Sequence, residues 1–392
     1  MQTSDLKYDC RHFRGEIPCA PNKLRDKVCA DCDEYDQIRT RILLIKLGAA
    51  GDVIRTTPLL ERFSKEYPGA HITWLTHTPE VLPKSKIDKI YKFDFKALYA
   101  LTHLKFDVVV NLDKDIEACA LLNDIPAAKK FGFGLQEGHI VPVNALAEHK
   151  LLTGAFDNLS KLNRKNYLQE IFEICGFEFQ QEPYVLEVDP KHRDMWRGLH
   201  DMASGREIIG LNTGCGERWL TRLWPEEYWV SLIRQLQVRN YFPLLLGGPA
   251  EDAQNRRLAQ SSEAHYPGTF SLQQFLSLTS QCRVIVTPVT MMMHIAIGLR
   301  IPLVLFNNIF NPHEFELYGN GVMLQPESGC DCYFANTCNR ARHCMNDLRV
   351  ETVLSAIESM SEYSPLEGGQ GGVAQNRDEI ADTDNTPLKG GI

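Results

Sequence analysis

The sequence lacks any long apolar run: the longest, at residues 42–45 and 242–246, fall far short of the roughly 20 residues that a membrane-spanning helix needs. It also lacks a basic block, since 50 acidic against 42 basic side chains give a net charge of −8. We therefore exclude nucleic acid as the expected main partner, because binding it requires a surface that neutralises phosphates. The N-terminal residues are polar, without the apolar stretch of a signal peptide. We expect a cytoplasmic protein.

Short apolar segments alternate with amphipathic ones along most of the 392 residues. Such alternation is typical of parallel sheets joined by right-handed helical crossovers, and it predicts an α/β protein with two Rossmann-like halves. Strands are expected at residues 41–48, 70–76, 108–112, around 131, 207–214, 243–248, 283–287 and 302–306, and helices at 53–69, 163–177, 225–237, 249–260 and 290–298.

This pattern divides the chain into four regions: a Cys-rich arm at 1–40, a first domain at 41–195, a second domain at 196–360, and a tail at 361–392. The tail contains six glycines and almost no large apolar side chains, so we expect it to be disordered. Two facing Rossmann-like domains leave a cleft at the carboxyl ends of their strands, where ligands normally bind.

Most of the 12 cysteines fall into two clusters. Metal ligation is favoured over disulfides, because we expect a reducing compartment. An arm without a core would gain order from a structural zinc ion, with iron and free thiols as the alternatives and His12 and His343 as substitute ligands. The first cluster is Cys10, Cys19, Cys29 and Cys32; the second, in which one-residue spacing is less suited to a shared ion, is Cys330, Cys332, Cys338 and Cys344.

Residues 46–52, with the sequence KLGAAGD, follow the first expected strand and lead into a helix. Gly48 and Gly51 allow a tight turn and a close approach of the backbone to a ligand. Asp52 has two interpretations at this point: an N-cap that accepts from free helix amides, or a general base that faces the cleft. The spacing does not satisfy the GxGxxG pattern of dinucleotide-binding oxidoreductases, which disfavours that class.

Three strand-to-helix turns in the second half are suited to binding an anion. The Gly-rich loop from Thr213 and Gly214 to Arg222 directs amides, a hydroxyl and a cation toward a phosphate. Trp224 either stacks on a ligand or packs beneath its own helix. The remaining candidates are Glu251, which binds ribose hydroxyls or favours a helix N-terminus; Thr290, a candidate N-cap; three methionines expected in the core; and His294, a ligand contact or a core histidine.

Four of these segments resemble glycosyltransferase family 9, the heptosyltransferases that build the inner core of lipopolysaccharide. They are IKLGAAGDVIRTTPLL, NTGCGERWLTRLWPEEYW, LLLGGPAE and VTMMMHIAIGLRIPLVLF, within roughly residues 41–350. The resemblance implies a B-type glycosyltransferase fold of two facing Rossmann-like domains with a cleft between them. It also implies an inverting transfer from a nucleotide sugar, without a catalytic metal or other cofactor.

The resemblance also implies roles for particular residues. Asp52 becomes the catalytic base, Glu251 contacts the nucleoside, and Arg222 stands where the family usually has a lysine for the diphosphate. Thr290 and His294 match the family motif Asp-Thr-Gly-x-x-His. Val289 and Met291 depart from it, because they replace the Asp and the Gly.

We therefore expect a cytoplasmic heptosyltransferase-like enzyme that acts at the inner face of the membrane. The expected donor is ADP-heptose or another nucleotide sugar, and the expected acceptor is lipid-linked or a lipopolysaccharide core. The alternative is a catalytically silent relative that binds a nucleotide sugar or a partner protein, favoured by Val289, Met291 and the Cys-rich arm.

Overall fold

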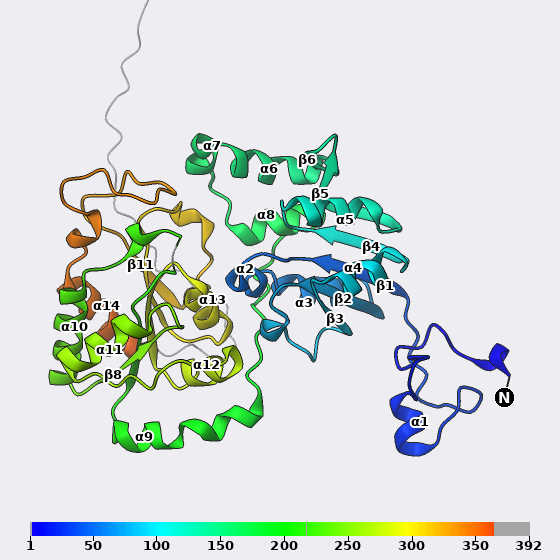
Figure 1. The fold of residues 1–392 in the computed structure, drawn as a ribbon, viewed down its shortest axis with the longest axis horizontal. Helices are drawn as coiled ribbons and strands as arrows, with labels where there is room; N and C mark the ends of the chain where they lie inside the picture. Colours follow the sequence, from blue (N-terminus) through cyan, green and yellow to red (C-terminus); the bar gives the residue numbers. More distant parts are fainter. Residues whose placement is uncertain (1, 217, 364–392) are drawn as a thin grey trace, which may run out of the picture.

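The chain folds into two α/β halves, each built around its own sheet, in a computed structural model that describes residues 2–216 and 218–363 (Figure 1). The first sheet has the strand order β3-β2-β1-β4-β5-β6 and is parallel except for β6, which runs antiparallel to β5. Its strands are β1 (Thr40–Ile45), β2 (Ala70–Thr76), β3 (Lys89–Lys92), β4 (Phe106–Asn111), β5 (Ala127–Gln136) and β6 (His139–Pro142). Its helices are α2 (Ala50–Ile54), α3 (Pro58–Glu66), α4 (Phe95–Thr102), α5 (Ile116–Asp124), α6 (Glu148–Ala155), α7 (Asp157–Leu162) and α8 (Tyr167–Ile174).

The second sheet is parallel throughout, with the order β11-β10-β9-β7-β8. Its strands are β7 (Ile208–Asn212), β8 (Phe242–Leu246), β9 (Val284–Pro288), β10 (Leu303–Phe306) and β11 (Gly321–Leu324). Around it lie α9 (Arg197–Ala203), α10 (Glu226–Val238), α11 (Asp252–Ser262), α12 (Leu272–Thr279), α13 (Met291–Gly298) and α14 (Val350–Glu362). Residue 195 lies in a 3-10 helix, Pro190–Trp196, in the connection between the two sheets.

The central strands are continuous apolar runs because helices cover both faces of each sheet. Residues 42–45 of β1 are completely buried, as a parallel strand in the middle of an α/β sheet requires. The strand order changes direction between β1 and β4 in the first sheet and between β7 and β9 in the second. Loops at such switch points, beyond the carboxyl ends of the strands, are the usual place for a ligand in doubly wound sheets.

Two predictions about helices are corrected. The expected helix at 53–69 is two helices, α2 and α3, because Pro58 has no amide to donate and the hydroxyls of Thr56 and Thr57 bond back to the carbonyls of Asp52 and Ile54. The expected tail begins too early, since α14 continues to Glu362. The rest of the predicted tail, 364–392, lies outside the described residues.

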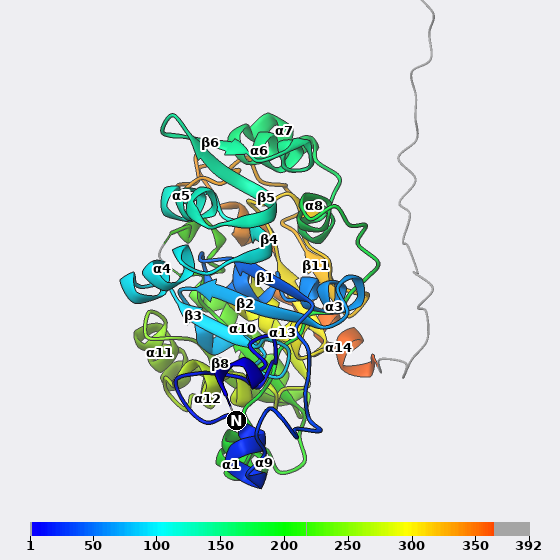
Figure 2. The same ribbon diagram turned by 90° about the vertical axis from the view of Figure 1, so that its right-hand side faces the viewer.

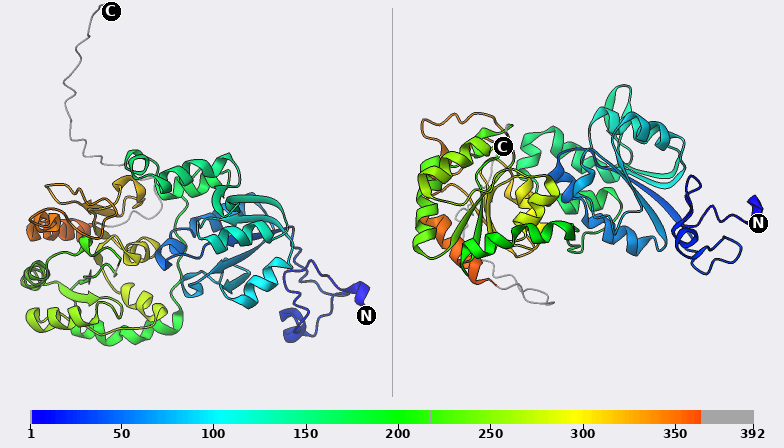
Figure 3. Two further views of the ribbon diagram at one scale, coloured as in Figure 1. Left: turned by 45° about the horizontal axis from the view of Figure 1, so that its top comes forward. Right: turned by 60° about the horizontal axis from the view of Figure 1, so that its bottom comes forward.

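The N-terminal arm, residues 2–39, lies beside the first half on the side away from the second half (Figures 1 to 3). It contains the short helix α1 (Ala20–Arg25) and a β-bridge between Cys10 and Gln37. Arg11 holds the arm to the first sheet: it donates to the Ala70 carbonyl at 2.8 Å and pairs with Asp88. The arm is therefore attached near the amino ends of β2 and β3.

Candidate active site

A cavity of about 470 Å³ lies between the halves, at the carboxyl ends of β1, β7, β8 and β9. Helices α2 and α13 meet beside it (Figure 1). The first half contributes Ala49, Ala50, Gly51, Asp52 and Arg55; the second contributes, among others, Gly214, Trp219, Arg222, Glu251, Thr290, Met291, His294, Phe310, Glu314 and Phe334. Seven of the predicted site residues therefore share one cavity with Gly51: Asp52, Gly214, Arg222, Glu251, Thr290, Met291 and His294.

Asp52 is the third residue of α2, so the N-cap interpretation is wrong: the N-cap is Ala49. The Asp52 side chain is 35% exposed, and its Oδ1 lies 2.8 Å from Arg55 Nη2. Burial alone would raise the pKa of Asp52, but the positive charges of Arg55 and Lys46 outweigh it and lower the pKa. The carboxylate is therefore ionised at neutral pH and borders the cavity, as a proton acceptor must.

Arg55 joins the two halves across the cavity. Its Nη1 lies 2.8 Å from Glu314 Oε1, while its guanidinium stacks 3.6 Å from the centroid of the Tyr167 ring. Burial alone would lower the pKa of Arg55, but the carboxylates of Asp52 and Glu314 outweigh it and raise the pKa. One fixed cation thus orients the Asp52 carboxylate and contacts the opposite half. Spacing did not predict Arg55, although an i,i+3 acid–base pair was visible in the sequence.

Asp113, which was not predicted from the sequence, stabilises the loop before α2. This buried carboxylate accepts from the amides of Leu47 and Gly48, the latter at 3.3 Å, and pairs with Lys46. Burial alone would lower the pKa of Lys46, but its acidic neighbours outweigh it and raise the pKa. The signal for Asp113 was its position just after β4, the strand beside β1.

The two predicted loop glycines have different surroundings. Gly48 lies against Asp113 and does not line the cavity, so its predicted approach to a ligand is not seen. Gly51 lines the cavity and packs against the other half: a Cβ there would lie 2.8 Å from His294 Cδ2. Glycine at 51 therefore allows α2 and α13 to approach each other.

In the second half, α13 begins as predicted, with Thr290 as its N-cap and the Thr290 hydroxyl accepting from the Met292 amide at 3.2 Å. His294 is buried and lines the cavity, with the Tyr184 hydroxyl 3.3 Å from its Nδ1. Burial and the nearby Arg55 lower the pKa of His294 to about 3. The imidazole is neutral at physiological pH, so it offers a ligand a hydrogen bond and no positive charge.

The three methionines of α13 lie in two different environments. Met292 and Met293 are buried in the core, as expected, whereas Met291 borders the cavity.

Glu251 lies immediately after the β8 turn and accepts from the Gly248 amide at 2.9 Å. Its side chain occupies the space where a Cβ at position 214 would stand, so any other residue there would displace the Glu251 side chain. The two predicted residues are in contact, and together they form one wall of the cavity.

Arg222 lines the cavity, but its guanidinium also holds protein carbonyls. It donates to the carbonyls of Cys215, Val289 and, at 3.3 Å, Trp219. Burial lowers its pKa. Arg222 thus ties the Gly-rich loop to the loop before α13, and Val289, where the family motif has Asp, takes part through its main chain.

Two predicted donor contacts lie elsewhere. Thr213 is fully buried and donates to Asn255 Oδ1 at 2.6 Å. Trp224 is 2% exposed, and its Nε1 donates to the Leu348 carbonyl at 2.8 Å, so it packs beneath its own helix. Trp219 and the phenylalanines Phe275, Phe310, Phe315 and Phe334 do line the cavity. Of the two interpretations of Trp224, packing beneath its own helix is therefore confirmed, and Trp219 is the tryptophan of this loop that lines the cavity.

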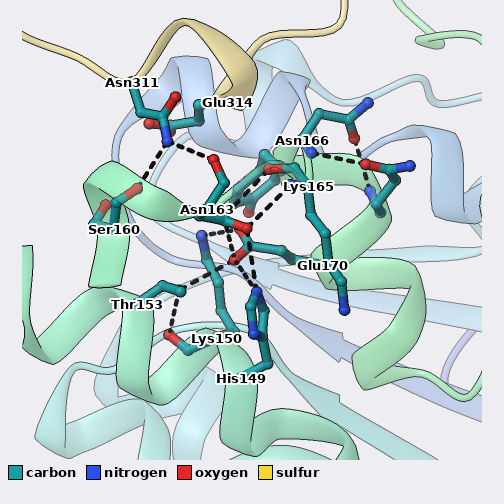
Figure 4. A network of polar contacts seen from close by, with 12 residues as sticks. His149, Lys150, Thr153, Ser160, Asn163, Lys165, Asn166, Glu170, Asn311 and Glu314 are labelled. Atoms are coloured by element: carbon teal, nitrogen blue, oxygen red, sulfur yellow. Dashed lines mark hydrogen bonds and ion pairs between the residues drawn. The ribbon is translucent and has the colours of Figure 1, made fainter. Parts of the chain in front are cut away.

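A polar network is centred on Glu170 (Figure 4), and its Lys150 Nζ lies 5.2 Å from the centroid of the Tyr167 ring. The buried Glu170 carboxylate accepts from Lys150 at 2.5 Å and from Thr153 and Asn163, both at 3.1 Å. Asn311 of the second half joins the network by donating to the Ser160 and Asn163 carbonyls at 2.7 and 2.8 Å (Figure 4). The network braces α6, α7 and α8 and ties them to the second half.

All 12 cysteines are free thiols. Among residues 2–216 and 218–363, no three His, Cys, Asp or Glu side chains are placed around one point where they could hold a metal ion. In the second cluster, Cys332 and Cys344 are buried, and burial raises the pKa of Cys330 to about 12. These thiols pack as small apolar side chains.

The profile of glycosyltransferase family 9 (heptosyltransferase) matches residues 95–333, more than half of the chain. The chain belongs to glycosyltransferase family 9. No curated protein matches it significantly. The family match confirms the resemblance read from the sequence motifs, even though the matched range begins after the Asp52 loop.

Solved structures of other family 9 proteins share the fold. A glycosyltransferase family 9 protein from Veillonella parvula is 19% identical, with 83% of this chain and 98% of that chain covered and a TM-score of 0.65. The E. coli ADP-heptose lipopolysaccharide heptosyltransferase II is 17% identical, with 82% and 98% covered and a TM-score of 0.63. The E. coli heptosyltransferase WaaC with ADP is 16% identical, with 82% and 98% covered and a TM-score of 0.54. This family 9 chain has the predicted B-type glycosyltransferase fold.

No helix in the part of this family 9 chain that the structure describes combines the length and the apolar character required to span a bilayer.

Proposed function

We propose that this family 9 protein is an inverting glycosyltransferase in which Asp52 is the catalytic base. The observation that carries the proposal is the position of an ionised carboxylate on one wall of the cavity, opposite the start of α13 and the Gly-rich loop. A helix start with free amides attracts the diphosphate of a nucleotide sugar. The sugar would then lie between the diphosphate and Asp52.

In the proposed reaction, the Asp52 carboxylate takes the proton of an acceptor hydroxyl. The acceptor oxygen forms a bond to the anomeric carbon as the bond from that carbon to the diphosphate breaks, and the nucleoside diphosphate leaves with the electron pair. Arg55 is a positioning residue, because it orients Asp52 and keeps it ionised. No step requires a metal ion.

We propose ADP-heptose as the donor. Two of the similar structures are described as an ADP-heptose heptosyltransferase and as a heptosyltransferase with ADP. In this chain, Glu251 borders the cavity and could accept from ribose hydroxyls, while Arg222, Thr290 and Met291 line the same cavity and could bind the diphosphate. Neutral His294 could donate to a phosphate oxygen.

The proposed acceptor is an anionic glycan, such as a lipid-linked or lipopolysaccharide core sugar at the inner face of the membrane. The support is a group of cations in the first half: Lys46, Arg55 and Lys150 act on the Asp52 carboxylate, and Lys114 lies near Lys150. Burial and the neighbouring Lys150 lower the pKa of Lys114 to about 8. Lys114 Nζ donates to the Lys150 carbonyl at 3.4 Å, and among the described residues Lys114 is in none of the ion pairs.

The test is transfer from ADP-heptose to truncated lipopolysaccharides of increasing core length, followed by mass spectrometry and by NMR of the new anomeric centre. We expect one heptose added with inverted configuration, at a rate that a strong chelator does not change. Calorimetry on the same protein measures donor binding separately. Tight donor binding without transfer to any core would contradict the proposal and support the catalytically silent relative.

A further inference from the structure

We propose that the N-terminal arm is a metal-binding module in which Cys10, Cys19, Cys29 and Cys32 bind one zinc ion. All four thiols line a single cavity of about 450 Å³ within the arm. The spacing in the sequence is eight, nine and two residues, so the fold brings together thiols that the sequence keeps apart. The inference does not depend on the proposed transfer reaction.

The arm needs a source of order that its own packing does not supply. In residues 2–39 the only buried residues are Cys10 and Pro21. The large apolar side chains Tyr8, Ile17 and Leu24 remain exposed at 63%, 54% and 73%. Segments below about 40 residues usually need a metal, a disulfide or a partner to fold. A metal ion bound by residues from both ends of the arm would link these segments and stabilise the folded arm.

The donor chemistry favours zinc. Four thiolates are the ligand set of a closed tetrahedral structural zinc site, and a Cys-x2-Cys pair is the usual knuckle of such sites. The four thiols surround the cavity without converging on one point. Zinc binding therefore requires the four Sγ atoms to turn about their Cα–Cβ bonds into rotamers that meet inside the cavity. Binding one Zn²⁺ as four thiolates releases four protons.

The position of the arm separates this site from transfer chemistry. Arg11 joins the arm to the amino ends of β2 and β3 through the Ala70 carbonyl and Asp88. The Asp52 loop follows the carboxyl end of β1, one strand length away, about 20 Å at ~3.3 Å per residue. Figures 1 and 3 show the arm on the far side of the first half from the second half. The metal is therefore structural, and its loss should unfold the arm while the cavity stays intact.

The experiment uses the full chain, purified without added metal and analysed by mass spectrometry of its elements. We expect about one zinc per chain. A Cys29→Ser, Cys32→Ser double variant should lose it, whereas a matched Cys332→Ser, Cys338→Ser variant should keep it. Co²⁺ exchanged into the wild type should give the intense visible absorption of a tetrahedral thiolate site, which the arm variant should lack. If the arm variant does not fold, chelation of the wild type replaces it, with new proteolytic cleavage expected within residues 2–39 only.

Several results would overturn the proposal. A wild type without metal and without the Co²⁺ spectrum would remove the site, and loss of metal from the Cys332, Cys338 variant alone would move it to the second cluster. Iron in place of zinc would refute the zinc assignment. If chelation stops sugar transfer while the proteolysis pattern of the arm is unchanged, the metal is catalytic and not structural.

Discussion

On the first half's side of the cavity the polar groups are charged side chains, with Asp52 beside Arg55 and a buried Lys46–Asp113 pair beneath the loop. On the second half's side the charged side chains Arg222, Glu251 and Glu314 are each bonded to other protein groups, and the remaining polar groups are main-chain groups and neutral side chains. The start of α13 is capped by Thr290, His294 is neutral, and the guanidinium of Arg222 is bonded to carbonyls.

This difference in polar groups indicates that the two halves perform different tasks, proton acceptance and donor binding. A proton acceptor needs a carboxylate kept ionised by a nearby cation, which the first half provides. A donor that carries its own negative charge needs directed amides in a close-fitting loop, which the second half provides through glycine at 214 and the Arg222 contacts. We infer that the first half determines the rate of transfer and the second half determines donor affinity.

The largest effect is expected at Asp52. Asp52→Ala should lower kcat by roughly 10²- to 10⁴-fold, because it removes the proton acceptor, while the donor Kd stays within a few fold. Steady-state kinetics and calorimetry measure the two. Asp115→Ala removes an exposed carboxylate that makes no capping bond, and it serves as the control with normal kcat. Transfer near the wild-type rate in Asp52→Ala would eliminate Asp52 as the base.

Arg222→Ala should weaken donor binding about tenfold or more, since a charge-assisted contact typically contributes roughly 1.5 to 3 kcal/mol. The melting temperature should also fall, because the carbonyls of Cys215 and Val289 lose their shared donor. Arg222→Lys keeps the charge but not the fork geometry, so its affinity should lie between the two. Unchanged affinity in Arg222→Ala would place the diphosphate elsewhere.

Arg55→Met sharpens the claim that a cation keeps Asp52 ionised. The pKa of Asp52 is lowered in the wild type, so activity is retained as pH falls until the carboxylate protonates. Removing the Arg55 charge raises that pKa, and the acid limb of kcat/KM should move to higher pH. Glu314→Gln removes the contact across the cavity but leaves Arg55 beside Asp52, so its acid limb should move less. Identical acid limbs in wild type and Arg55→Met would contradict the role of Arg55.

Gly51→Ala tests the contact between the two walls. Its methyl group would meet His294 at 2.8 Å, so α2 and α13 must move apart, and we expect transfer to fall several-fold without unfolding. The control is Gly198→Ala in α9, where a Cβ meets nothing within 4 Å. Full activity in Gly51→Ala would show that the close approach of the helices is not needed.

The smallest effects are expected from the two tryptophans. Trp219→Phe changes the cavity wall and should alter donor affinity by a few fold at unchanged stability. Trp224→Phe loses the hydrogen bond to Leu348 and should cost about 1 kcal/mol of unfolding free energy at unchanged affinity. Thermal melts and donor titrations of both variants measure stability and affinity. Weaker donor binding in Trp224→Phe, with unchanged binding in Trp219→Phe, would make Trp224 the donor contact.

Sequence patterns predicted most of the central strands because a strand buried on both faces must be a continuous apolar run, as in β1 and β9. They also placed Asp52 and the start of α13 correctly at the carboxyl ends of strands. The split between α2 and α3 is encoded locally by Pro58, because a proline disfavours helical geometry at the residue before it.

Other features depend on contacts between distant segments. The pairing of Lys46 with Asp113 joins two loops 67 positions apart, and the contact of Gly51 with His294 joins the two halves. The inward direction of Thr213 depends on Asn255, and the burial of Trp224 depends on Leu348. No local period in the sequence encodes these partners.

The most direct test of the division of tasks is the single-turnover rate at saturating donor, measured for Asp52→Ala and Arg222→Ala together. We expect Asp52→Ala to bind the donor but to turn it over slowly at every concentration, whereas Arg222→Ala should recover a rate close to that of the wild type once the donor is saturating. A slow single turnover in saturated Arg222→Ala, together with a normal one in Asp52→Ala, would contradict this division of tasks.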